Sequence, residues 1–173
     1  SSLDGLDVIA VNFRQDPTWS FEVLKAKTFK FPKPLLAKLK QGSSLPIEQY
    51  LMLEQEFSDW VAKKINDFKS GVTSAPPCVG IHGQTLLHSP RKGYSLQMLS
   101  GHRVSVATGL TVVSDFRNKN IALGGQGAPL VPFCDIHRFI IYLFKNAKHI
   151  MSNLLKKLQK HQFLVYTLKK YQK

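Results

Sequence analysis

Apolar and polar residues alternate near the start of the chain, in the pattern typical of β-strands. Residues 7–13 (DVIAVNF) follow an Asp-Gly pair, the strongest short signal for a β-hairpin, so we predict a strand that leaves this turn. The strand that enters the turn would have to precede Asp4, and only three residues do so. A second strand is predicted over residues 20–31, where long or bulky side chains recur at every second position until Pro32.

Helical spacing replaces this alternation further along the chain. A short helix is predicted over residues 34–40. A longer one, of about 24 residues, is predicted to begin at Ser44 as its N-cap and to end at Gly71. Between Ile47 and Phe68 the apolar residues return at every third or fourth position, which predicts one buried face.

Shorter elements follow in the next part of the chain. Strands are predicted at 78–81, 85–88, 93–97 and 110–114, with a helix at 102–108 that stops at Gly109. The strand at 110–114 (LTVVS) is almost entirely apolar, so we expect both its faces to be buried in a mixed or parallel sheet. Strands first, and then strands alternating with helices, indicate the α/β class.

Composition limits the kinds of protein that this chain can be. Hydrophobic residues make up 43% of the 173 residues, which is enough for a packed core in one domain. The longest apolar run, residues 139–144, is much shorter than the roughly 18–20 residues of a membrane-spanning helix, so no transmembrane segment is expected. Cys78 and Cys134 form no CxxC motif and are expected to be reduced thiols in the cytoplasm.

The positive charge is concentrated at the C-terminal end. The formal net charge is +13, yet residues 140–173 contain eight Lys and no acidic residue. Apolar positions from Ile140 to Leu158 have helical spacing, so one interpretation is a basic amphipathic helix that binds an anionic membrane or a partner's groove. The other, which we favour, is a segment that resembles out-of-frame translation of AT-rich DNA. No RNA-stacking motif or recognition helix stands out, so a specific nucleic-acid partner is not expected.

Three loops contain the residues that a ligand site needs. The first is the turn at residues 1–7, where hydroxyls, backbone amides and two carboxylates suit a phosphate group and Mg²⁺. The alternative is an ordinary polar hairpin turn. The candidate residues of this loop are Ser1, Ser2, Leu3, Asp4, Gly5, Leu6 and Asp7.

The second loop contains His82-Gly83-Gln84-Thr85. Gly83 allows close approach of the backbone, and Gln84 can form hydrogen bonds with sugar hydroxyls. Alternatively, His82 is a structural residue at the end of a strand. The spacing between His82 and His88 is not that of metal ligands, so a zinc site is not expected.

The third loop begins with Asp115 and Arg117, directly after the apolar strand at 110–114. Open α/β sheets bind ligands at this end of their strands. Arg117 suits a carboxylate or phosphate, and Asp115 could orient it. The following glycine cluster matches neither a Walker loop nor a dinucleotide fingerprint, and alone it would be a tight loop. Its residues are Gly124, Gly125, Gln126 and Gly127. No G-x-S-x-G motif or Cys/His pair supports a hydrolase.

In this order, the loops resemble those of one family, the anhydro-N-acetylmuramic acid kinases of the sugar kinase–actin-like ATPase superfamily. The matching stretches are SSLDGLD at 1–7, HGQTLLH at 82–88, LQ at 96–97, TGLTVVSDFR at 108–117 and GGQGAPLVP at 124–132. The resemblance covers residues 1–139. It implies the N-terminal half of a two-domain actin-like (ribonuclease H-like) kinase, which is a mixed sheet flanked by helices. Residues 140–173 follow as a Lys-rich helical tail, to which the resemblance does not extend.

The resemblance implies an activity that depends on ATP and Mg²⁺. Family members open the ring of 1,6-anhydro-N-acetylmuramic acid and phosphorylate its 6-oxygen, giving N-acetylmuramic acid 6-phosphate during peptidoglycan recycling in the cytoplasm. A homodimer is a further possibility in the full-length family. By this resemblance, residues 1–7 would end the hairpin that binds the ATP phosphates. The sugar cleft would be lined by His82, Gln84, Asp115, Arg117 and the loop at 124–129.

Some family features have no counterpart in this sequence. The stretches N-[IL]-G-G-x-A-N and D-T-G-P-x-N, the second of which carries the family's general base, do not occur in the 173 residues. No catalytic residue is therefore assigned. The alternative function is a non-catalytic remnant of the kinase, truncated or frameshifted. Met98, Leu99 and Ser100 also stand where the family has an apolar residue and then Gly-Asp.

Overall fold

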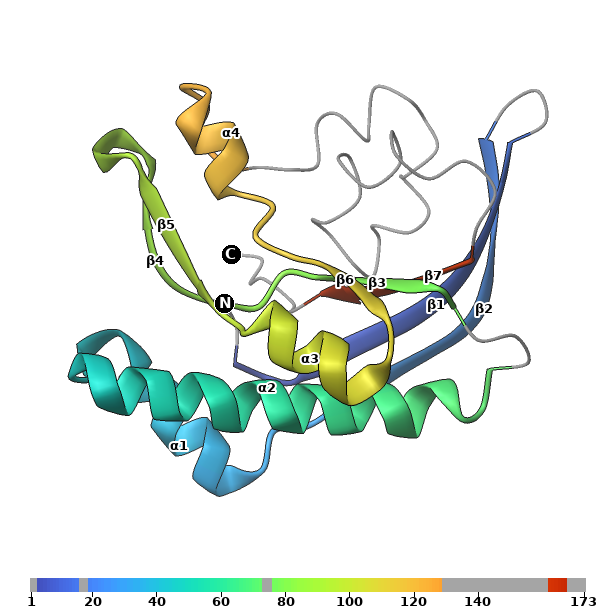
Figure 1. Ribbon diagram of the computed structural model, residues 1–173, viewed down its shortest axis with the longest axis horizontal. Coiled ribbons are helices and arrows are strands. Elements are labelled where there is room, and N and C mark those ends of the chain that lie inside the picture. Colours follow the sequence, from blue (N-terminus) through green and yellow to red (C-terminus); the bar gives the residue numbers. More distant parts are fainter. Residues whose placement is uncertain (1–2, 16–18, 73–75, 129–161, 168–173) are drawn as a thin grey trace.

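The computed structural model describes residues 3–15, 19–72, 76–128 and 162–167 of the chain (Figure 1). Five strands form one mixed sheet in the order β2-β1-β7-β3-β6, and two further strands form a separate hairpin. The strands of the mixed sheet are β1 (Leu6–Gln15), β2 (Trp19–Phe29), β3 (Cys78–Ile81), β6 (Thr111–Val113) and β7 (Gln162–Thr167), and those of the hairpin are β4 (Gln84–Ser89) and β5 (Tyr94–Met98).

The directions of the strands follow from their connections. β1 and β2 are consecutive and antiparallel, whereas β3 and β6 are parallel and are joined through the hairpin and a helix. β7 lies between β1 and β3, antiparallel to β1 and parallel to β3. The helices are α1 (Lys33–Gln41), α2 (Ile47–Lys69), α3 (Gly101–Thr108) and α4 (Asn118–Ala122), with short 3₁₀ turns at Gly42–Ser44 and Pro90–Lys92.

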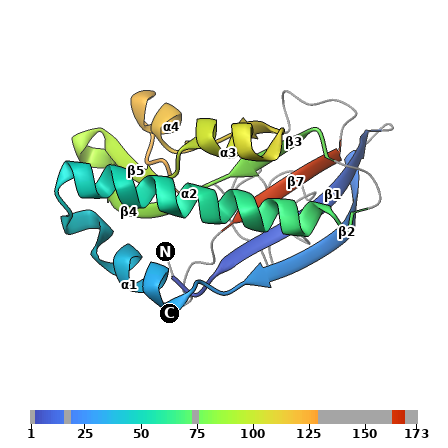
Figure 2. The same ribbon diagram turned by 60° about the horizontal axis from the view of Figure 1, so that its bottom comes forward.

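The long helix α2 forms the core by packing on the sheet. It runs across one face, with α1 and α3 beside it (Figures 1 and 2). The side chains that meet there come from α2, β1 and β3, and each is at most 1% exposed: Phe57, Val61, Ile65, Phe68, Val8, Ala10, Val79 and Ile81. Burial of this many apolar side chains is the dominant stabilising contribution to such a fold.

The sequence predicted most of these elements correctly, including both long strands, α1, α2, α3 and the short strands. The N-cap at Ser44 is wrong. α2 begins after Pro46, which has no side-chain capping bond, and the Ser44 hydroxyl donates instead to the Gln41 carbonyl in the preceding 3₁₀ turn. The second strand also ends two residues early, at Phe29.

Two other expectations need correction. The strand at 110–114 is not buried on both faces, because β6 is an edge strand of the described sheet in which Thr111 is exposed. In the C-terminal region, the helical stripe predicted from Ile140 to Leu158 lies outside the described residues. Residues 162–167 form strand β7, so the prediction of a helical tail is wrong for these six residues.

None of the helices in the described ranges is long and apolar enough to cross a membrane.

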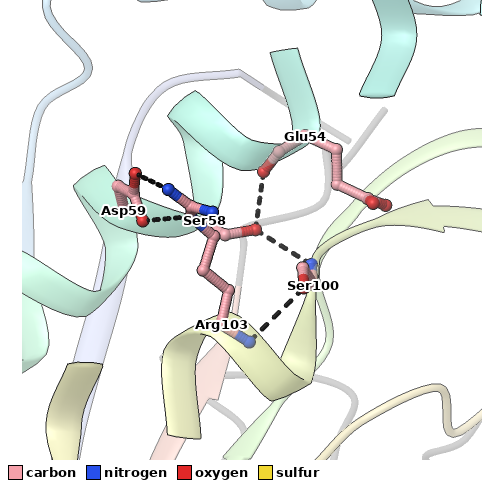
Figure 3. A network of polar contacts seen from close by, with 5 residues as sticks. All are labelled: Glu54, Ser58, Asp59, Ser100 and Arg103. Atoms are coloured by element: carbon pink, nitrogen blue, oxygen red, sulfur yellow. Dashed lines mark hydrogen bonds and ion pairs between the residues drawn. The ribbon is translucent and has the colours of Figure 1, made fainter. Parts of the chain in front are cut away.

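A buried serine joins α2 to α3 (Figure 3). The Ser58 hydroxyl donates to the Glu54 carbonyl at 2.6 Å and accepts from the Ser100 backbone N–H at 2.9 Å. Ser100 is the N-cap of α3, and its side chain accepts from the Arg103 N–H. Arg103 in turn forms an exposed ion pair with Asp59. The start of α3, which leads into β6, is therefore fixed to the middle of α2.

We expect Ser58→Ala to reduce the free energy of unfolding by about 1–3 kcal/mol, because the partly buried Ser100 N–H loses its partner. Ser70→Ala is the matched control, since the exposed Ser70 hydroxyl bonds only the Asp67 carbonyl of its own helix; it should change stability by no more than about 0.5 kcal/mol. Urea denaturation of both variants measures the difference. Equal effects would show that the Ser58 contact contributes nothing specific.

The thiol of Cys78, at the start of β3, is buried, and desolvation raises its pKa to about 11. At pH 8 only about 0.1% of such a thiol is thiolate, the form that reacts. In a Cys134→Ser variant we therefore expect native Cys78 to react with a disulfide reagent at least about 100-fold more slowly than the urea-unfolded chain. The native rate should rise with pH up to about 11. Similar native and unfolded rates at pH 8 would contradict this burial.

Candidate functional site

All three loops singled out in the sequence reach the same edge of the sheet, namely the one formed by the C-terminal ends of β3 and β6. β3 and β6 are parallel, so their C-terminal ends lie together. Val8, near the start of β1, and Ile81, at the end of β3, both pair with Tyr166 of β7. The turn before β1 therefore lies at the edge where β3 and β6 end, as the arrangement of the ribbon also shows (Figure 1).

His82 and Arg117 meet directly at this edge. His82 follows β3 and Arg117 follows β6, and both are more than nine-tenths buried. The Arg117 Nε–H donates to His82 Nε2 at 2.9 Å. Because an arginine can only donate, Nε2 must accept, which places the imidazole proton on Nδ1. Nδ1 lies 3.0 Å from the Gly83 carbonyl, to which it can donate. This arrangement holds His82 as one neutral tautomer.

Arg117 brings a positive charge into a largely dry environment. Its Nη1 donates to the Gly127 carbonyl at 3.2 Å, and no carboxylate in the part of the chain that the structure describes forms an ion pair with it. Desolvation lowers the pKa of Arg117 from its usual value, although a guanidinium stays protonated in proteins. A buried cation with neutral partners favours the approach of an anion, because the anion would compensate the desolvated charge.

The glycine loop is held against Arg117 from two sides. Besides the bond from Arg117, the Gly127 N–H donates to the side-chain oxygen of Asn120 at 2.7 Å. The backbone of Asn120 accepts from the Gly125 N–H, and a Cβ on Gly125 would collide with the Asn120 side chain. Gly124 and Gly127 both have positive φ, of 83° and 60°. These contacts define the course of the loop from 124 to 127.

Asp115 does not orient Arg117, as the sequence suggested it could. It has a φ of 58°, a left-handed conformation that Asp tolerates better than most residues, and its carboxylate accepts from the Asn118 side chain at 2.8 Å. Asn118 also accepts from the Ser95 N–H of β5 at 3.0 Å. Asp115 therefore connects the strand end to the β4–β5 hairpin through Asn118, and it is exposed to solvent.

Two glutamines of the hairpin have unused acceptors. The Oε1 atoms of Gln84 and Gln97 are buried and form no hydrogen bond within the described residues. Gln84 is 2% exposed, and its amide donates only a long bond to the Thr85 carbonyl. A buried acceptor without a donor is costly, and a ligand hydroxyl or amide would satisfy it. Across the described ranges no three His, Cys, Asp or Glu side chains gather in a way that could hold a metal ion.

The turn before β1 is described from Leu3 onward, and Ser1 and Ser2 lie outside the described residues. Leu3 has a φ of 51°, and a Cβ on Gly5 would lie 2.7 Å from the Phe29 carbonyl oxygen, so only glycine fits beside the end of β2. The Asp7 carboxylate accepts from the Thr28 hydroxyl across the β1–β2 pair. Asp4 is exposed. The Asp7 carboxylate is thus bound to the neighbouring strand.

Comparison with known proteins now decides the relationship. The sequence model of a family described as "AnmK: Anhydro-N-acetylmuramic acid kinase" matches residues 1–163, nearly the whole chain. The chain belongs to the anhydro-N-acetylmuramic acid kinase family. This match extends beyond residue 139, where the resemblance seen by motif ended.

Curated relatives carry the same family name. Proteins named anhydro-N-acetylmuramic acid kinase from Nitrosomonas europaea, Shewanella halifaxensis and Shewanella pealeana are 38%, 37% and 35% identical to this chain over 157, 158 and 163 residues. The matches cover 82%, 86% and 89% of this chain and 42%, 40% and 42% of those proteins. The chain therefore spans about two fifths of the length of these kinases.

Within this chain, the structure brings together some of the expected site residues and not others. His82, Arg117 and Gly127 are in contact, while Gln84 is buried on the adjoining strand. The Asp115 carboxylate accepts a hydrogen bond from the Asn118 side chain, and Gln126 is exposed. The sequence analysis did not single out Asn118 and Asn120. Asn118 bonds Asp115 and the β4–β5 hairpin, and Asn120 bonds the glycine loop. Their position directly after Arg117, in a stretch leading to a glycine cluster, was the available signal.

The two left-handed glycines allow a matched test of the loop. A Cβ on Gly127 would lie 2.8 Å from Ile121 Cγ1, whereas a Cβ on Gly124 would meet nothing within 4 Å. Both alanine variants should lose about 1–2 kcal/mol from the left-handed backbone. Gly127→Ala should lose roughly a further 1–3 kcal/mol from overpacking. Thermal denaturation compares them, and losses of equal size would mean that Gly127 is not packed against α4.

Proposed function

We propose that this chain contributes the sugar-positioning part of an ATP-dependent kinase that opens 1,6-anhydro-N-acetylmuramic acid and phosphorylates its 6-oxygen. Membership of the family and the names of the relatives support this activity. The structural observation that carries it is the buried Arg117 guanidinium, whose hydrogen-bond partners among the described residues are His82 and Gly127, at the edge where β3 and β6 end.

The chemistry of the proposed substrate fits this edge. A muramic acid carries a carboxylate, and the remaining N–H groups of Arg117 would donate to it in the charge-assisted bonds that carboxylates form best with guanidinium groups. The unused Oε1 of Gln84 would accept from a sugar hydroxyl or from the N-acetyl amide. His82 would act through Arg117, because both of its ring nitrogens already have neighbours on the protein.

The turn before β1 would face the ATP phosphates. Its described residues fit this role by their backbone, because Leu3 and Gly5 have positive φ and turns of this kind can direct amides toward an anion. The exposed carboxylate of Asp4 would help to hold the Mg²⁺ that accompanies ATP, since Mg²⁺ prefers oxygen ligands and retains much of its water. Bound ATP and Mg²⁺ would supply the phosphoryl group and neutralise its charge.

The main task of the protein in such a kinase is to position the phosphoryl donor and acceptor. Phosphoryl transfer requires alignment of donor and acceptor and stabilisation of charge more than a protein nucleophile. In our proposal, residues 1–139 together with strand β7 form the N-terminal domain of an actin-like kinase of peptidoglycan recycling in the cytoplasm. We assign no general base in this chain.

A binding experiment separates this proposal from a simple structural role of Arg117. In an isotope-labelled chain, 1,6-anhydro-N-acetylmuramic acid should shift the NMR signals of the Arg117 Nε–H and of the loop from Gly124 to Gly127. The matching sugar without the carboxylate, 1,6-anhydro-N-acetylglucosamine, should bind roughly 10- to 100-fold more weakly, as expected for loss of a charged hydrogen bond.

Arg117→Met should remove the preference for the acidic sugar, whereas Arg91→Met, at an exposed arginine outside the site, should leave it unchanged. Because both sugars are also compared on the unaltered chain, a folding defect in Arg117→Met would not obscure the result. Equal affinity of the unaltered chain for the two sugars would contradict the assigned role of Arg117.

A further inference from the structure

The central strand of the mixed sheet is the last described element of the chain. All six residues of β7 pair with β1, from Asp7 with Thr167 to Asn12 with Gln162. On its other side β7 pairs with β3, from Cys78 with Phe163 to Ile81 with Tyr166. The sheet is thus continuous only because a segment from the end of the sequence lies in its middle (Figure 2).

Leaving β1 and β3 unpaired at this position would cost free energy. The residues of β1 and β3 beside it belong to the core under α2, and Val8, Val79 and Ile81 are at most 1% exposed. Without a strand between them, both β1 and β3 would present a row of backbone N–H and C=O groups without partners next to that core. Such groups cost free energy when they are removed from water, so the position favours any strand that can pair on both sides.

The segment that occupies the position differs in charge from its surroundings. Residues 140–173 contain eight lysines, and their longest stretch without a lysine is 161–168, which contains β7 (QFLVYT). Strand residues between two other strands, next to an apolar core, are expected to be uncharged and rich in β-branched and aromatic types. The position therefore selects an extended, uncharged, apolar segment.

Strand direction, and not a short connecting loop, determines which segment can bind between β1 and β3. One side of β1 is taken by β2, so a strand leading into the Asp4–Gly5 turn and antiparallel to β1 would have to lie where β7 lies. β7 is separated from the preceding described residue, Ala128, by 33 residues. The entropic cost of closing a loop changes slowly with such lengths, so its pairing with β1 and β3 holds β7 in place more than its tether does.

From these observations we propose that the position between β1 and β3 is a strand-acceptor site. It binds an extended apolar peptide segment antiparallel to β1 and parallel to β3, and residues Gln162–Thr167 of the same chain occupy it exchangeably. Recognition is by β-strand addition, in which main-chain hydrogen bonds provide the affinity. The proposal does not depend on the kinase activity.

Disulfide trapping tests the occupant in the full chain. In a background with Cys78→Ala and Cys134→Ala, the pair Ile9→Cys and Val165→Cys joins register partners, whose Cβ atoms in antiparallel strands are about 4.5–5.5 Å apart. The matched control, Ile9→Cys with Leu164→Cys, is out of register by one residue. After mild oxidation we expect a cross-linked monomer on a non-reducing gel, at several-fold higher yield than in the control.

Exchange is tested with a synthetic peptide of residues 160–169. Added before oxidation, it should reduce the cross-linked yield by at least half, and a scrambled peptide should not. Anisotropy of the labelled peptide with the unaltered chain gives a second measurement that does not depend on the cysteine variants. A yield no higher than the control, cross-linked dimers in place of monomers, or failure of the peptide to compete and to bind would each overturn the proposal.

Discussion

The packing of α2 on β1 and β3 is the constraint on which the other parts depend. Phe57, Val61 and Ile65 are fully buried in that contact, and they hold two strands that are more than 60 residues apart in sequence at a fixed separation. Because β3 is fixed there, the residues after it are fixed as well. The same helix, through Ser58, holds the start of α3 and so the approach to β6. One apolar face therefore positions both strand ends that form the site.

The charged centre of the site depends on this rigidity. A buried guanidinium is tolerated only where acceptors are held at hydrogen-bond distance, and among the described residues Arg117 has two neutral ones, on His82 and Gly127. If the ends of β3 and β6 moved apart, the Arg117 guanidinium would lose its bond to His82. The site is thus stabilised by the core, while its unneutralised charge leaves it ready for an anion. In our proposal, the same side chain, that of Arg117, both connects the two strand ends and recognises the anion.

Local features were predictable from the sequence, and long-range ones were not. The helix that begins at Ile47 and the stop at Gly109 depend on neighbouring residues, and both predictions are confirmed. The predicted buried face is confirmed from Phe57 to Phe68, but it is wrong for Ile47 and Leu51, which are exposed. Thr111 was misjudged because a strand's apolar composition does not reveal its place in the sheet. The bond between His82 and Arg117 joins residues 35 apart and follows only from the parallel pairing of β3 and β6. The interior position of β7 had no local signal beyond the lysine-free stretch from 161 to 168.

The order of the strands also determines when the sheet can form. Asp7 and Thr167 are register partners 160 residues apart, so the pairing in the middle of the sheet has almost the greatest sequence separation that this chain allows. Contacts of this kind form slowly, because a long stretch of chain must be ordered first. During synthesis from the N-terminus, the β1–β2 hairpin would leave the ribosome long before its other neighbour exists. Until β7 pairs with it, that edge of β1 presents unpaired N–H and C=O groups, which makes the nascent chain a target for aggregation and for chaperones.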